Sequence, residues 1–97
     1  MKARRVRELL AQGRVGEEVA AQGWLRSARH AKNVSFLDLS DGSSLAGLQV
    51  VAAPELPGFE RQVRPLRTGC AVREQGELVE SPGQGQRVEL QAVRVEL

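Results

Sequence analysis

The sequence is poor in cysteine, histidine and aromatic residues, and it contains no long apolar run. One cysteine cannot form an internal disulfide, and one cysteine with one histidine cannot build a zinc site. No stretch of about 18 apolar residues and no signal-peptide core occurs, which favours a cytoplasmic protein without a membrane segment. We therefore expect neither a metal nor a cofactor.

The length of 97 residues predicts a single domain, 1–97, without a repeat or an inter-domain linker. A complete enzyme of this size would be unusual, so a binding module is the first expectation.

The chain also offers no convincing catalytic group. Asp41-Gly42 is typical of a turn, the single His30 cannot define a triad, and Cys70 has the strand parity of a buried, inert thiol.

Charge is unevenly distributed along the chain. Residues 1–32 carry eight basic and three acidic residues, a balance of +5, whereas residues 33–97 carry six basic and nine acidic residues, a balance of −3. Such asymmetry indicates a polyanionic partner such as nucleic acid, and charged faces that are merely solvated are the alternative.

The order of predicted elements indicates an all-β fold. Residues 3–11 have helical spacing, and five extended segments follow at 17–32, 34–40, 45–53, 69–79 and 87–97, with a short helical connector at 58–67. This order predicts an OB-fold, a five-stranded Greek-key barrel, with a leading helix in residues 1–14 and the barrel in 17–97. An SH3-like barrel is the alternative, which accounts less well for the insertion at 54–68.

Three positions depart from regular strand alternation. Gly23 within the first strand predicts a bulge or a sharp coil. Glu74 breaks the inward apolar pattern of the fourth strand, which predicts a bulge there. The apolar parity of the fifth strand switches near Ala92, which predicts another. The stretch Ser81-Pro82-Gly83-Gln84-Gly85 has the composition of a loop.

Strand parity also separates an outward polar set from the core. This set contains an aromatic ring, arginines, amides and a carboxylate: Arg26, Phe36, Gln49, Arg73, Gln75 and Glu77, with Arg29 near the end of its strand. Such a combination is typical of a reader of single-stranded RNA, because unpaired bases stack on the ring and bond to the polar groups. The alternatives are burial of Phe36 beneath another segment and simple solvation of Glu77.

Three stretches resemble the N-terminal anticodon-binding domain of asparaginyl-tRNA synthetase: Gly23–Val51, Leu66–Val72 and Gly76–Ala92. The pattern that begins GW and ends FLDLSDGS is shared with aspartyl and lysyl relatives of the same class II subclass. The SPGQGQ loop followed by VELQA is more particular to the asparaginyl branch. The resemblance covers nearly the whole chain, from about Leu9 to Leu97.

The resemblance implies roles for five of these residues. Phe36 is expected to stack on an anticodon base, the central uridine, and Gln49 to bond the edge of that base. Arg26 and Arg29 are expected to contact anticodon bases or their phosphates, and Glu77 to help read the anticodon edge.

The implied partner is the anticodon loop of an asparagine-type tRNA. Ser27, Ala28 and His30 depart from the residues common in relatives, and the class II catalytic domain that follows in a synthetase is absent from the chain. We therefore expect no aminoacylation by this chain alone. Two alternatives stay open: a free-standing OB-fold protein that binds single-stranded nucleic acid, and a protein-interaction module such as a homodimer.

Overall fold

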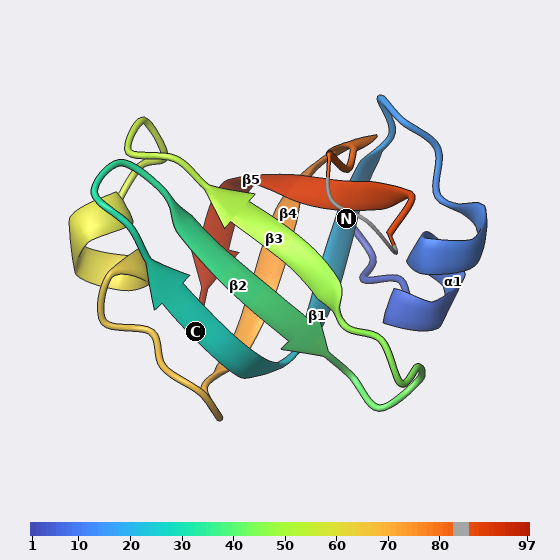
Figure 1. The fold of residues 1–97 in the computed structure, drawn as a ribbon, viewed down its shortest axis with the longest axis horizontal. Helices are drawn as coiled ribbons and strands as arrows, with labels where there is room; N and C mark the ends of the chain where they lie inside the picture. The colour runs from blue at the N-terminus through green and yellow to red at the C-terminus, as the bar shows by residue number, and fades with distance from the viewer. Residues whose placement is uncertain (83–85) are drawn as a thin grey trace.

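A computed structural model describes residues 1–82 and 86–97, and it confirms the predicted order of elements (Figure 1). Residues 83–85 of the predicted loop lie outside the described residues. The elements are α1 (Val6–Gln12), β1 (Glu18–His30), β2 (Ser35–Ser40), β3 (Leu48–Ala52), η1 (Phe59–Val63), β4 (Ala71–Glu80) and β5 (Val88–Glu96). No helix in the described ranges is both long and apolar enough to span a membrane.

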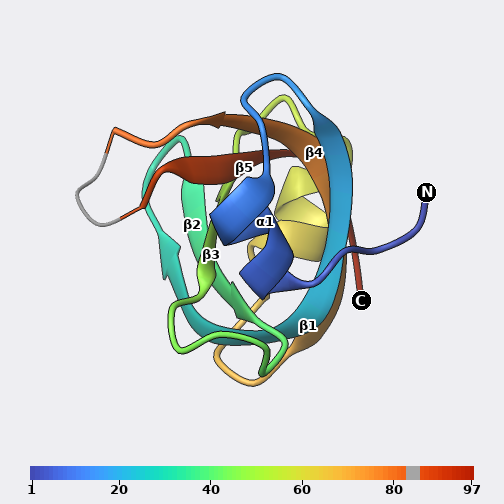
Figure 2. The ribbon, with the colours of Figure 1, turned by 90° about the vertical axis from the view of Figure 1, so that its right-hand side faces the viewer.

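The five strands close into a barrel in the order β1-β2-β3-β5-β4, which confirms the predicted OB-fold over the SH3-like alternative. Neighbouring strands are antiparallel except β3 and β5, which are parallel. β1 pairs with β4 through its first half and with β2 through its second half. The long, coiled β1 therefore closes the barrel, as the end-on view in Figure 2 shows.

The change of partner along β1 requires a close approach of two backbones at Gly23. A Cβ atom at this position would lie 2.0 Å from the carbonyl oxygen of Ser40. Of the two features predicted for Gly23, a bulge or a sharp coil, the bulge is wrong at this position, because Gly23 stays in register with Val72 and the register shift lies between Leu25 and Ser27. Gly23 is needed for backbone proximity, which is a second common reason for glycine in a strand.

The predicted bulge near Ala92 is confirmed. Gln75 pairs with Arg94 whereas Gly76 pairs with Ala92, so the register shifts by one residue in β5. The predicted bulge at Glu74 is wrong, because β4 alternates regularly through this residue and directs its side chain inward. The apolar pattern is broken there by a buried acid rather than by the backbone.

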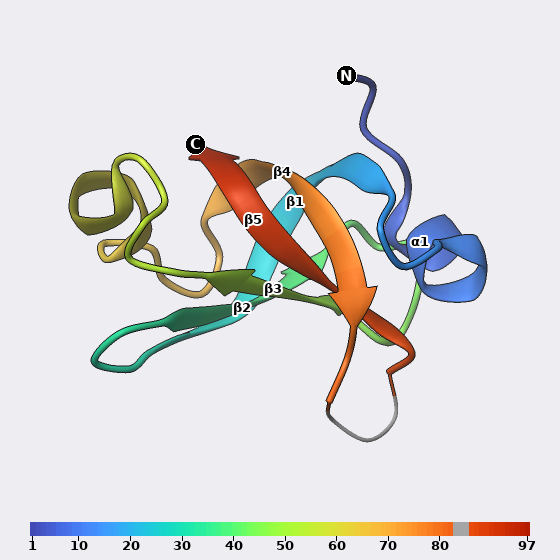
Figure 3. The ribbon, with the colours of Figure 1, turned by 90° about the horizontal axis from the view of Figure 1, so that it is seen from above.

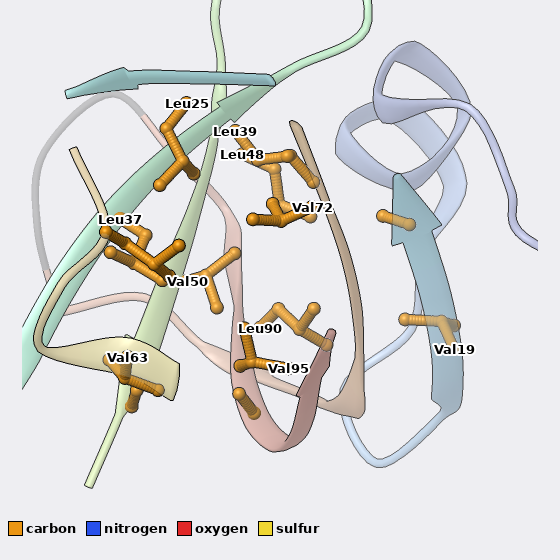
Figure 4. Packing of buried hydrophobic residues seen from close by; sticks show 14 of the residues in the cluster. Val19, Leu25, Leu37, Leu39, Leu48, Val50, Val63, Val72, Leu90 and Val95 are labelled. Atoms are coloured by element: carbon orange, nitrogen blue, oxygen red, sulfur yellow. The ribbon is translucent and has the colours of Figure 1, made fainter. Parts of the chain in front are cut away.

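The two helical segments close opposite ends of the barrel (Figures 2 and 3). α1 buries Val6 and Leu9, and η1 buries Phe59 and Val63. Between these ends the inward side chains of all five strands form one apolar cluster, part of which is drawn in Figure 4. Its largest fully buried members are leucines, which supply much of the apolar area that stabilises the fold.

The Asp41-Gly42 turn has a second role besides turn formation. One carboxylate oxygen of Asp41 accepts the backbone N–H of Val6 at 3.0 Å, and the hydroxyl oxygen of Ser43 accepts the N–H of Arg7 at 2.9 Å. These are two of the N–H groups that a helix leaves unpaired at its start. A loop distant in sequence therefore caps α1, whose own N-cap residue, Arg5, makes no side-chain cap.

Candidate nucleic-acid interface

One row of outward side chains crosses the barrel from β1 to β4. Arg29 of β1 lies opposite Phe36 of β2, and Phe36 lies opposite Val51 of β3. The row continues through Gln91 of β5 to Glu77 of β4. Phe36, Arg29 and Glu77 therefore face outward, as predicted, and all three lie in this row.

Arg29 and Phe36 form the most distinctive pair of this row. The guanidinium carbon of Arg29 lies 4.8 Å from the centroid of the Phe36 ring, within the range of a cation–π contact. Phe36 is half-buried, and Arg29 is exposed. A partly exposed aromatic ring beneath a flexible cationic side chain can serve as a surface for a stacking ligand.

The register shift in β1 determines that Arg29 faces outward. Leu25 points into the core, and strict alternation from Leu25 would turn Arg29 inward as well. Leu25 pairs with Leu39 and Ser27 with Asp38, so one additional residue is accommodated between the two pairs. This bulge reverses the alternation beyond it and directs Arg29 to the same face as Phe36.

A second row lies beside the first and contains the predicted residue Gln49. Ser27, Asp38 and Gln49 are cross-strand neighbours on β1, β2 and β3. The side-chain amide of Gln49 donates a hydrogen bond to a carboxylate oxygen of Glu89 on β5, at 3.3 Å. Glu89 is only 7% exposed, so this contact holds the amide of Gln49 in one orientation.

The two rows border one hollow in the outer face of the barrel, with a volume of about 290 Å³. Its lining residues are Ser27, Arg29, Phe36, Leu37, Asp38, Gln49 and Gln86. The lining thus combines an aromatic ring, a cation, two amides and a carboxylate. These groups can stack on a planar ring and both donate and accept hydrogen bonds along its edge.

Arg26 lies at the margin of this face rather than in the hollow. Its guanidinium donates to the carbonyl oxygen of Leu45 in the β2–β3 loop at 2.5 Å, and it lies 3.9 Å from a carboxylate oxygen of Asp38. The side chain is 45% exposed. Arg26 is therefore available to solvent next to the hollow, although its hydrogen bond ties it to the loop.

Glu77 lies farther from the hollow than the sequence suggested. Three strand spacings separate it from Phe36, which is about 14 Å along the curved face at roughly 4.8 Å per strand. Glu77 borders two other hollows, both shared with Val93 of β5. The structure thus brings together Arg29, Phe36 and Gln49 and leaves Glu77 apart from them.

Two other outward residues lie outside the hollow. Arg73 donates hydrogen bonds to the side chain of Gln22 and to the backbone carbonyl of Met1, so it fastens the N-terminal segment to the barrel. Gln75 borders one of the hollows next to Glu77. Both residues face outward, as strand parity predicted, but neither lines the hollow beside Phe36.

Sequence reasoning missed Asp38 and Glu89 as members of the site. Asp38 has the outward parity of Phe36, which was an available signal. Glu89 also lies on the polar parity of its strand, but no local pattern reveals that β5 runs parallel to β3 beside Gln49.

Comparison with known proteins places this arrangement in a family. A family described as an OB-fold nucleic acid binding domain, and named for the tRNA anticodon, matches residues 19–97. The chain belongs to this family of anticodon-binding OB-fold domains. The class of protein is therefore a nucleic-acid-binding OB-fold domain, which agrees with the barrel and with the aromatic and polar groups on its outer face.

Curated relatives specify the branch of the family. The chain is 47% identical over 97 residues to an asparagine–tRNA ligase of Synechocystis, covering all of this chain and 21% of that protein. It is 50% identical over 84 residues to the asparagine–tRNA ligase of Hahella chejuensis, covering 86% of this chain and 18% of that protein. The expected resemblance to asparaginyl-tRNA synthetase is thus confirmed. The chain spans about a fifth of the length of these relatives.

Solved structures share the fold. An asparaginyl-tRNA synthetase from Pyrococcus horikoshii, complexed with asparaginyl-adenylate, superposes with a TM-score of 0.83 at 18% identity, over 100% of this chain and 22% of that one. An OBody bound to hen egg-white lysozyme superposes with a TM-score of 0.85 at 20% identity, over 100% of this chain and 93% of that one.

Proposed function

We propose that this domain binds the anticodon loop of an asparagine-type tRNA and contributes tRNA recognition to asparagine aminoacylation. The main observation behind the proposal is that the Arg29–Phe36 pair lies beside Gln49, held by Glu89, around one hollow. Catalysis would be performed by a class II catalytic domain joined to this one, in the cytoplasm. The similarity to asparagine–tRNA ligases supports that assignment.

Phe36 would provide the stacking surface for the central uridine. In the free domain Arg29 covers the ring. On binding, the base would take the position over the ring, and the long Arg29 side chain would move to a phosphate, to which arginine can bind with two hydrogen bonds. Affinity from stacking on one base is typically ~1–3 kcal/mol.

Gln49 would read the edge of the same base. Its amide nitrogen already donates one hydrogen to Glu89, which leaves the second N–H and the amide oxygen for a ligand. One donor next to one acceptor complements a uracil edge, on which the N3–H donor lies beside a carbonyl acceptor. Glu89 would act as a positioning residue, since it fixes which end of the amide faces the hollow.

The remaining predicted residues would contact neighbouring parts of the loop. Arg26, exposed at the margin of the hollow, would bind a phosphate or base beside the central one. Glu77, at the far end of the row, would accept a hydrogen bond from a base farther along the strand, because a carboxylate repels phosphate but accepts from a base N–H.

The substitution Phe36→Ala tests the proposal. The asparagine anticodon stem-loop should bind the variant ~5- to 150-fold more weakly than the unmodified domain, which corresponds to the loss of ~1–3 kcal/mol of stacking. A fluorescence titration at fixed salt measures the affinity, since protein–RNA affinities depend strongly on salt. Val15→Ala, at an exposed apolar residue in the loop before β1, is the matched control and should bind as the unmodified domain does.

Two results would contradict the proposal in different ways. Unchanged affinity of Phe36→Ala would exclude the stacking role. Equal affinity for a stem-loop with a changed central base would instead favour a free-standing binder of single-stranded nucleic acid. A tight dimer without RNA affinity in sedimentation would favour the protein-interaction module.

A further inference from the structure

Glu74 is an acid inside the barrel without a hydrogen-bonding partner. Its side chain belongs to β4 and is 0% exposed. Neither carboxylate oxygen has a hydrogen-bond partner among the described residues. Its cross-strand neighbours are Ala21 on β1 and Val95 on β5, both apolar and buried. Val95 itself belongs to the core cluster shown in Figure 4.

The charged groups nearest to Glu74 along the strands are directed away from it. On β4, Arg73 binds Gln22 and the Met1 carbonyl. On β5, Arg94 and Glu96 are exposed and lie 3.9 Å apart as an ion pair. On β1, the flanking residues are Ala20 and Gln22, which carry no charge.

The helical segments that close the barrel offer no buried charge to Glu74. The buried residues of α1 are Val6 and Leu9, and those of η1 are Phe59 and Val63. An ionised carboxylate in such surroundings has lost its water without gaining a partner, which strongly favours the protonated acid. Burial accordingly raises the pKa of Glu74 to about 8.

We propose that the folded barrel retains one proton on Glu74, and that release of this proton to solvent weakens the seam where β4 meets β1 and β5. β4 and β5, which pair as antiparallel neighbours along this seam, are the orange and red strands of Figure 3. The register shift next to Glu74, between Gln75 and Gly76, is the least regular point of that pairing. Separation of the strands there gives the carboxylate access to water.

The sign of the effect follows from proton linkage. The unfolded chain binds the proton with an ordinary glutamate pKa near ~4.3, whereas the folded chain holds it more tightly. The resulting stability is fully present below the unfolded pKa and declines as the pH rises through the pKa of the folded state. Between about pH 5.5 and pH 7.5 the unfolding equilibrium constant should rise roughly tenfold for each pH unit, as one bound proton requires.

Urea denaturation of the unmodified domain and of Glu74→Gln at a series of pH values tests this inference. Glutamine has nearly the same shape but cannot ionise, so the rise of the unfolding constant between pH 5.5 and pH 7.5 should be absent in Glu74→Gln. Glu80→Gln, at an exposed glutamate on the same strand, is the matched control and should keep the tenfold rise. Equal pH dependence of the unmodified domain and Glu74→Gln would overturn the proposal.

A measurement without substitution covers the case in which Glu74→Gln does not fold. The side-chain carboxyl carbons of glutamate, followed by NMR as the pH is raised, report each titration directly. One glutamate should titrate more than two pH units above the others, and its shift should coincide with faster hydrogen exchange of β4 amides. If every glutamate titrates below pH 6, the proposal is refuted. Neither experiment requires RNA, so failure here is separate from failure of the proposed anticodon function.

Discussion

Removal of the Asp41 side chain should release α1 from the barrel. Asp41→Ala deletes Oδ2, which accepts the Val6 N–H, and Oδ1, which accepts two bonds from Ser43. The backbone N–H of Ser43 lies 3.0 Å and its hydroxyl 2.5 Å from Oδ1. Ser43 in turn accepts the Arg7 N–H at 2.9 Å. One substitution therefore affects both hydrogen bonds that cap the N-terminus of α1, those to the N–H groups of Val6 and Arg7.

The magnitude follows from these bonds. Loss of an N-cap acceptor costs ~0.5–2 kcal/mol, and loss of a hydrogen bond to a charged group costs ~1.5–3 kcal/mol. The contributions overlap because Ser43 depends on Asp41, and Asp41 is partly exposed. We expect a decrease of about 2 kcal/mol in the free energy of unfolding, or a Tm lower by roughly 8–16 °C for a domain of this size. Ser43→Ala, which removes one cap, should cost about 1 kcal/mol.

Urea denaturation and calorimetry at pH 7 provide the measurement. The matched control is Ser44→Ala, one residue farther along the loop, which leaves all four of these hydrogen bonds in place. If Asp41→Ala and Ser44→Ala agree within about 0.5 kcal/mol, the loop does not hold the helix and the reasoning is refuted.

The pH dependence of this cap is opposite in sign to that of Glu74. Partial burial raises the pKa of Asp41, but the bonds from Ser43 and from the Val6 N–H outweigh burial and lower it below the ordinary value. Its stabilising contribution is therefore present above the unfolded pKa of about 3.9 and is lost as the pH falls through the folded value. The difference between the unmodified domain and Asp41→Ala should shrink in strong acid.

Two further predictions concern the β4–β5 pairing and the proposed RNA-binding hollow beside Phe36. Gly76→Ala should destabilise the domain by about 3 kcal/mol or more, because the new Cβ would lie 2.1 Å from the carbonyl oxygen of Gln91. A Tm within about 3 °C of that of the unmodified domain would contradict this. Arg29→Gln should reduce the slope of log affinity against log salt by about 0.7 for a single-stranded loop, and an unchanged slope would show that Arg29 makes no phosphate contact.

The site illustrates where prediction from sequence ended. Strand parity placed Phe36 and Gln49 outward because side-chain alternation is local. The same rule turns Arg29 inward when it is counted from Leu25, and only the register shift in β1 corrects it. A bulge depends on how two strands pair, so the pattern of one strand indicates its presence better than its position. The predicted bulge at Gly23 was misplaced for this reason.

Contacts between strands that are distant in sequence were also beyond local patterns. Glu89 orients Gln49 across 40 residues because β3 and β5 run side by side. Asp41 caps a helix 35 residues before it. The sequence pattern at Glu74 predicted a bulge because buried acids without a partner are rare. A regular strand with a buried acid was therefore the less expected explanation.

The sequence by itself determined the order of the elements, the class of the barrel, its family, and which residues could face outward. The element order, the barrel class and the outward residues depend on composition and on periodicity over a few neighbours, whereas the family depends on the resemblance of three sequence stretches to known relatives. Only the tertiary structure decided that Arg29 and Phe36 stack, that Glu89 holds Gln49, that Glu77 lies apart, and that Glu74 is sealed in the core. These outcomes depend on the register between paired strands, both consecutive and distant in sequence, which is set when the whole barrel closes.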